Sequence, residues 1–378
     1  MKGRTRKAVI IFLLFAVVLV AVFIGKKIID ISAANTNVMT SETVVSHQLE
    51  KSLLERTTLD TVRLSNKNKE KLSENNRILS KREFIGAFLG VRNNKLVYSW
   101  RNGYSNTSPN TSFNVNSSVL VGKYQTVLDQ ALLLSLVNRG DVKLTDELSK
   151  YDVSSGAVGR LTVKQLLRNE SHLYVRKQSI ATIQNPRNKE YSNTLFKKGK
   201  GGMTDWVTAD TFIKRIVIAR ATSKSYESTF EQELTNKFGL SNTRFFNARQ
   251  TYTNDVTSYD KKIVNNTRVQ SKKLVIKKRS LNGNTLRMSL ADIVLSLNGI
   301  EKNRLFDSKY TQYFEDYIEQ SGVGSLNENV FTYNGNVAGQ ALAIKSNLDT
   351  QSTVVLITNY SDSDVSLTKH LSQLYRIL

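Results

Sequence analysis

The 378-residue sequence contains no cysteine and only three histidines. The absence of cysteine excludes disulfide bonds, thiolate metal sites and a cysteine nucleophile. The histidines, His47, His172 and His370, lie far apart, and none has the spacing of a metal-binding motif such as HExxH. We therefore expect no metal and no cofactor, and a Ser-His-Asp triad only if His172 serves it.

Acidic residues are also scarce. The chain has 54 Lys and Arg against 32 Asp and Glu, which gives a formal net charge of +22. A charge of this size favours anionic partners, namely nucleic acid, anionic lipid or the anionic polymers of a cell wall.

The N-terminal residues narrow this choice. Residues 1–7 are basic, and residues 8–25 form an uncharged apolar run close to the length of a membrane-spanning helix. The alternative is a signal peptide, but Lys26 and Lys27 follow the run at once and no cleavage site lies close behind it. We expect a single-pass anchor in the cell membrane, with a cytoplasmic N-terminus and an extracellular C-terminal domain. That location excludes nucleic acid, and an exported chain without cysteine is typical of Gram-positive bacteria.

Two further segments follow the predicted anchor. Residues 26–82 are polar, with some helical spacing of leucines, and predict a stalk or linker; a disordered tether is the alternative. A packed domain is expected over residues 83–378. It opens with two apolar segments, FIGAFLGV and KLVYSW, around a turn at Asn93-Asn94, which predicts a β-hairpin.

The middle of this domain reads as helical. Residues 124–137 are apolar on nearly every face, which predicts a buried central helix. Further helices are expected at residues 209–221, 225–238 and from Ser289, and two strands, ALAIKS and STVVLITNY, precede a last helix near residues 364–378. Strands at both ends of a domain commonly pair into one antiparallel sheet with the helices packed beside it.

From residue 84 onward the chain resembles the serine β-lactamase and penicillin-binding-protein-like family, of the class C type with its D,D-peptidase and esterase relatives. The resemblance lies in six segments in the family's order: FIGAFLGVRNNKLVYSWRNGYSN, LVNRGDVKLTDELSKY, LTVKQLLRNESHL, ARATSKSYESTFEQELTNKFGLSNTRFF, SLADIVLSLNG and STVVLITN. It implies an α/β transpeptidase-like fold, with an antiparallel sheet, flanking helices and a mainly helical subdomain.

The resemblance also implies a Ser-x-x-Lys motif at the start of the central helix. The spacing lets the lysine amine reach the serine hydroxyl and act as its base. Counting back from Gly140 by the family's usual interval reaches Lys123, and the base position three residues later is Thr126. The alternative nucleophiles are Ser117 and Ser118, but neither has a lysine three residues on.

The other two family motifs are altered as well. The alignment places Trp206 and Thr208 where the family has Tyr-x-Asn, although a literal match, with Tyr191 as its tyrosine, occurs at residues 191–193. On the strand that lines the family's cleft, Tyr333 replaces the basic residue of His-x-Gly or Lys-Thr-Gly, followed by Asn334 and a retained glycine, Gly335.

These changes lead to three hypotheses. The first is a catalytically degenerate, membrane-anchored protein that binds peptidoglycan, teichoic acid or a membrane protein partner, with Lys123, Trp206, Tyr333 and Asn334 as ligand-binding residues. Two basic runs, at residues 197–202 and 272–279, are candidate contacts for an anionic polymer. The second is an active serine hydrolase, a D,D-carboxypeptidase or a D-alanyl esterase on teichoic acid, that uses Ser117 or Ser118 with Tyr191. In the third, the stalk carries the function.

Overall fold

The structure is a computed structural model that describes residues 64–81, 84–93, 95–153, 156–175, 196–198, 203–264, 267–281, 283–301, 305–359 and 367–378. The predicted cytoplasmic tail, membrane span and first part of the linker lie outside these ranges. Within them, no helix has the length and apolar character needed to cross a bilayer.

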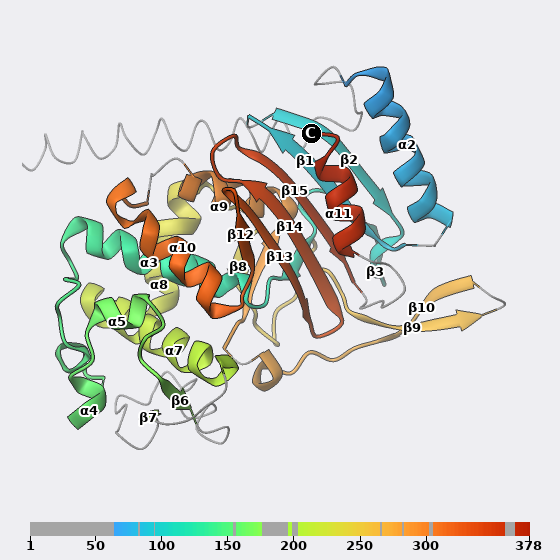
Figure 1. The fold of residues 1–378 in the computed structure, drawn as a ribbon. Helices are drawn as coiled ribbons and strands as arrows, with labels where there is room; N and C mark the ends of the chain where they lie inside the picture. The colour runs from blue at the N-terminus through green and yellow to red at the C-terminus, as the bar shows by residue number, and fades with distance from the viewer. Residues whose placement is uncertain are drawn as a thin grey trace, which may run out of the picture. The chain divides into compact units, whose positions relative to one another are not determined.

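The centre of the fold is a six-stranded antiparallel sheet, in the order β12-β13-β14-β15-β1-β2 (Figure 1). Its strands are β1 (Gly86–Arg92), β2 (Lys95–Asn102), β12 (Ser325–Asn327), β13 (Val330–Val337), β14 (Gln340–Asn347) and β15 (Ser352–Thr358). The first hairpin joins the last strands through β1 and β15, with Leu89 opposite Val355. The predicted pairing of strands from both ends of the domain into an antiparallel sheet is confirmed.

Side chains alternate between the two faces of the sheet along each strand. Both faces are buried, each in a different hydrophobic core. Leu89 and Val355 face a large core shared with the central helices. Phe88 and Leu356, one residue away, face a second core formed with α2 (Asn66–Lys81) and α11 (Leu367–Tyr375). The near-continuous apolar strands noted in the sequence therefore serve two cores rather than one.

Helix α2 corrects the predicted domain boundary. Its residues fall in the segment predicted as a linker, yet Leu72 and Leu79 are buried in the second core. The Asn75 side-chain oxygen lies 2.9 Å from Nδ1 of His370 on α11. The packed part of the chain therefore begins at or before residue 66, and not at residue 83.

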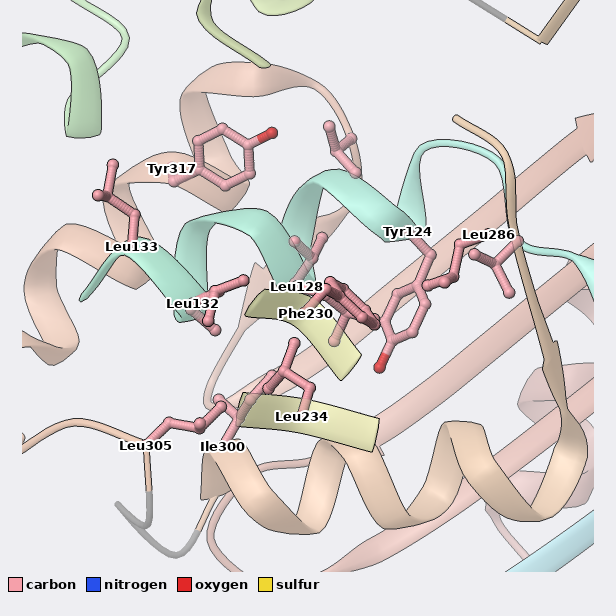
Figure 2. Close-up of a cluster of buried hydrophobic side chains, with 14 of the residues drawn as sticks. Tyr124, Leu128, Leu132, Leu133, Phe230, Leu234, Leu286, Ile300, Leu305 and Tyr317 are labelled. Carbon is pink, nitrogen blue, oxygen red and sulfur yellow. The ribbon is translucent and has the colours of Figure 1, made fainter. Parts of the chain in front are cut away.

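The helical part of the domain is organised around α3 (Tyr124–Arg139), which is buried from Tyr124 to Val137. Figure 2 shows α3 between Tyr317 on one side and Leu234 and Ile300 on the other. Around it are α4 (Gly156–Gly159), α5 (Val163–Leu167), α7 (Met203–Thr222), α8 (Tyr226–Phe230), the π-helical turn Glu231–Asn236, α9 (Leu290–Glu301) and α10 (Thr311–Ser321).

Short strands complete the fold. β11 (Leu286–Ser289) pairs with β5 (Ser118–Leu120) on one side and with β8 (Arg244–Phe245) on the other, and β5 leads through a short loop into α3. The remaining two-stranded pairs are β3 (Tyr104–Thr107) with β4 (Asn110–Ser112), β6 (Leu173–Val175) with β7 (Phe196–Lys198), and β9 (Tyr259–Val264) with β10 (Thr267–Lys273). Short 3-10 turns lie at Leu148–Tyr151, Lys278–Leu281 and Ser308–Tyr310.

Candidate functional site

The start of α3 carries the two residues that the sequence places at the nucleophile and base positions. Lys123 immediately precedes the helix, and its side chain is exposed. Thr126 is buried in the first turn, and its hydroxyl donates to the carbonyl oxygen of Lys123 at 2.8 Å. This hydrogen bond directs the Thr126 hydroxyl to the backbone. The two positions therefore contain no hydroxyl nucleophile with an amine base beside it.

Tyr333 on β13 reaches the same turn from the sheet. Its side chain is buried, and its hydroxyl donates to the Val121 carbonyl oxygen at 2.8 Å. Burial raises the pKa of Tyr333 to about 12, and hydrogen bonding with the backbone of Tyr124 and Lys123 opposes that rise. The tyrosine is therefore neutral at physiological pH. Its hydroxyl interacts with the helix-start backbone that, in a serine acyl-transfer enzyme, supplies N–H groups to the substrate oxyanion.

Two glycines make room for the Tyr333 hydroxyl. A Cβ atom at Gly335, on the same face of β13, would overlap this oxygen. Gly122, whose φ is +57°, faces it from the loop before α3, and a Cβ atom there would lie 3.2 Å away. A glycine within a strand often marks a place where a ligand or another part of the backbone approaches closely. In the structure the space is filled by the tyrosine of the same strand.

Asn334 does not join this cluster. Because side chains alternate along a strand, Asn334 lies on the opposite face of β13 from Tyr333. Its side-chain amide donates to the Thr368 hydroxyl at 2.7 Å, on α11. This geometry corrects the expectation that Asn334 and Tyr333 line one binding site.

Several solved structures share this architecture. The chain is similar to FmtA from Staphylococcus aureus, with a TM-score of 0.61 and 20% sequence identity over 87% of this chain and 94% of that one. A penicillin-binding protein from Bacillus halodurans matches with a TM-score of 0.59 and 11% identity, over 80% of this chain and 100% of that one. A class C β-lactamase matches with a TM-score of 0.59 and 14% identity, over 82% and 95% of the two chains. The fold is that of the serine β-lactamases and penicillin-binding proteins.

Sequence comparison gives no such match. No protein-family model matches the chain, and no curated protein matches its sequence. At these identities, the structural similarity establishes the β-lactamase-like fold alone.

The alternative nucleophiles of a β-lactamase-like enzyme, Ser117 and Ser118, are both buried. The Ser117 hydroxyl oxygen accepts from the backbone N–H of Asn114 at 2.9 Å. The Ser118 hydroxyl donates to the carbonyl oxygen of Asn242 at 3.0 Å. Both hydroxyls thus hold loops and strands together in this structure, and neither is presented to solvent.

The second motif of the β-lactamase-like fold maps onto α7. Trp206 lies in the first turn of this helix, and Thr208 follows in its second turn with a partly exposed side chain. Tyr191 lies outside the described residues. His172, the histidine that a Ser-His-Asp triad would need, is exposed and has a φ of +52°. Of the residues predicted for the site, the structure places Lys123, Thr126, Tyr333 and Gly335 at or beside the start of α3.

A buried charged network beneath this site was not predicted. Asp129 on α3 forms an ion pair with Arg215 on α7, with Nη2 and a carboxylate oxygen 2.8 Å apart. Asp129 also accepts from the Tyr226 hydroxyl. Arg215 donates further to the Gly283 carbonyl oxygen at 2.7 Å. The network fastens α3, α7 and α8 together, and removing one partner would leave a buried charge unpaired.

Two further charged residues of α7, Asp210 and Lys214, are also buried. Asp210 accepts from the Ser171 hydroxyl, and the Lys214 ammonium lies 3.8 Å from the centre of the Tyr317 ring. Burial raises the pKa of Asp210 and lowers that of Lys214. The signal for both networks was in the sequence, because Asp129, Lys214 and Arg215 interrupt otherwise apolar helices. Charges at such positions are seldom buried unless they are paired.

Proposed function

We propose that this protein is a non-catalytic, β-lactamase-like binding protein that is anchored in the cell membrane and binds an anionic polymer of the cell wall on the outer side. The main support for a lack of catalytic activity is the hydrogen bond from the Tyr333 hydroxyl to the Val121 carbonyl oxygen at the start of α3. It coincides with replacement of the nucleophile by Lys123 and of the base by Thr126.

A reactive lysine at position 123 does not restore turnover. A neutral amine can attack an ester or a lactam carbonyl and form an amide. Water hydrolyses such an amide too slowly to release the enzyme, so the reaction would stop after one event. Lys123 is moreover exposed to solvent and is not enclosed in a pocket that would position it for attack.

The choice of an anionic polymer rests on charge. The formal net charge of +22 creates a positive field that attracts polyanions at low salt. The predicted membrane anchor places the domain outside the cell, where peptidoglycan and teichoic acid carry repeated negative charges. A membrane protein partner is the alternative, and it needs a complementary surface rather than a polyanion.

The catalytic question is tested with covalent probes. The purified chain is incubated with a fluorescent penicillin and a fluorophosphonate, and its intact mass is measured. We expect no adduct from a chain that circular dichroism shows to be folded. An adduct that disappears in Ser117→Ala or Ser118→Ala would overturn the proposal in favour of a serine hydrolase.

The binding question is tested by sedimentation with purified cell walls before and after chemical removal of their anionic polymer. We expect the chain to sediment with the complete walls at low salt and to be released by high salt. Sedimentation that is unaffected by removal of the polymer would point to peptidoglycan. No sedimentation with either preparation would favour a protein partner instead.

A further inference from the structure

The most basic part of the described domain is the β9–β10 hairpin with the segment that follows it, residues 259–279. This stretch has one acidic residue, Asp260, and eight basic ones: Lys261, Lys262, Arg268, Lys272, Lys273, Lys277, Lys278 and Arg279. β9 and β10 pair only with each other among the described strands (Figure 1). The segment is thus an appendage on the sheet rather than part of it.

The base of this segment is fixed to the main sheet. The backbone N–H of Tyr259 donates to the Asn359 carbonyl oxygen at 3.1 Å, and that of Leu274 donates to the Ser258 carbonyl oxygen at 2.8 Å. The Leu274 side chain packs so closely over Gly339 that a Cβ atom there would lie 2.7 Å from its Cδ1 atom. These contacts hold the chain at residue 274 in one position at the end of β14.

Val275 follows this anchor and is 82% exposed. Single exposed apolar side chains are common on protein surfaces, but Val275 differs in the residues that flank it. Its neighbour Leu274 is packed inward, and exposed lysines, Lys273 and Lys278, lie on either side along the chain. The structure therefore presents an aliphatic side chain to solvent from a fixed backbone, surrounded by positive charge.

We infer that residues 272–278 are a docking site for an anionic membrane surface. Lysines near a bilayer are attracted by anionic headgroups, and an exposed aliphatic side chain between them can enter the interface. A soluble polyanion would engage the lysines and leave Val275 in water, so the exposed valine favours a lipid partner. The predicted anchor at residues 8–25 would keep the domain close to a bilayer, where weak contacts are strengthened by high local concentration.

The inference is independent of the proposed polymer binding and is tested on the full chain. The absence of cysteine allows a single fluorophore to be attached at Val275→Cys. The labelled chain is reconstituted into vesicles of phosphatidylglycerol mixed with phosphatidylcholine, or of phosphatidylcholine alone. Lipids that carry a spin label at the interface quench any fluorophore that enters it. A label at Lys164→Cys, an exposed position on α5, serves as the matched control.

We expect quenching at position 275 in the anionic vesicles, little in the neutral ones, and none at position 164 in either. Lys273→Gln/Lys278→Gln should remove the quenching, whereas Lys143→Gln/Lys224→Gln, an exposed pair elsewhere, should leave it unchanged. Quenching that persists without Lys273 and Lys278 would reflect insertion of the dye alone and would overturn the inference. So would equal signals at positions 275 and 164, or a label at 275 that responds to soluble polyphosphate but not to anionic lipid.

Discussion

The Tyr333 hydroxyl donates to the carbonyl oxygen of Val121 at 2.8 Å, and so joins strand β13 to the loop that begins helix α3. The resemblance to the serine β-lactamases implies that a substrate would reach the start of the central helix between these two elements. Here a side chain of the protein connects them. Under the proposed function, the substitutions at positions 123 and 126 and the filled space are two parts of the same change.

This geometry predicts that placing serine at position 123 and lysine at position 126 does not make the chain react with penicillin. In Lys123→Ser/Thr126→Lys, the serine would have an amine base three residues away. Tyr333 would still interact with the backbone at the start of α3. The backbone N–H groups there could therefore not bind the carbonyl oxygen of a substrate. We expect no adduct with fluorescent penicillin by intact-protein mass spectrometry. An adduct at position 123 in this double variant would show that Tyr333 does not block the site.

A second prediction concerns the space that Gly335 leaves for Tyr333. Gly335→Ala would place a Cβ atom in overlap with the tyrosine hydroxyl, and overpacking of this kind typically costs about 1–3 kcal/mol of unfolding free energy. Tyr333→Phe removes the nearest overlapping atom, the oxygen, and leaves the ring atoms Cζ and Cε1 at 2.5 and 2.9 Å, so the alanine should cost less, but not nothing, in that background. Urea denaturation of the four proteins in this cycle measures the difference.

The matched control is Gly140→Ala at the end of α3. Gly140 has a φ of +83° and no atom within 4 Å of an added Cβ, so its substitution strains only the backbone. Its cost should be the same with Tyr333 and with Tyr333→Phe. If the cost of Gly335→Ala is likewise independent of residue 333, the packing described for this site is wrong.

The sequence predicted the sheet more fully than the site. Alternating or continuous apolar residues identify strands locally, and the pairing of β1 with β15 follows from a general tendency of such domains. The contact between Tyr333 and Val121 links residues 212 positions apart and depends on where one tyrosine side chain points. No local pattern contains that information. Their positions in apolar helices signal that Asp129 and Arg215 are buried, but not that they pair with each other, because they are 86 positions apart.

The buried carboxyl group of Asp210 predicts a dependence of stability on pH. Burial raises its pKa from 3.8 to about 7, so the folded state holds the proton more tightly than the unfolded state. Stability from this group is complete below pH 3.8 and is lost as the pH rises toward 7, by at most about 1.4 kcal/mol per pH unit. Lys214, whose pKa is lowered to about 8, stays mainly protonated over this range.

Asp210→Asn should remove this dependence. Urea denaturation at pH 5 and pH 7 should show the wild-type chain losing stability relative to Asp210→Asn as the pH rises. Asp307→Asn, at a carboxylate that is 59% exposed, should follow the wild type at both pH values. A wild-type chain that gains stability relative to Asp210→Asn between pH 5 and pH 7 would contradict the assignment of a raised pKa to Asp210.

The last prediction tests whether α2 belongs to the folded domain. The helix was missed in the sequence because it is mostly polar, and only Leu72 and Leu79 provide a buried apolar contact. Leu79 is fully buried against the second face of the sheet, whereas its neighbour Ile78 is partly exposed. Truncating a buried leucine to alanine typically costs about 2–5 kcal/mol, because the cavity left behind closes only in part.

Leu79→Ala should therefore lower the unfolding free energy by several times more than Ile78→Ala, which removes a similar number of carbon atoms one residue earlier. Urea denaturation followed by tryptophan fluorescence suits this comparison, since Trp100 stacks on Phe88 in the same core, with ring centres 5.4 Å apart. Equal and small effects of the two variants would mean that α2 is a detachable stalk helix. A large effect of Leu79→Ala alone would mean that α2 is held on the sheet, so the connection to the predicted membrane anchor would begin before this helix.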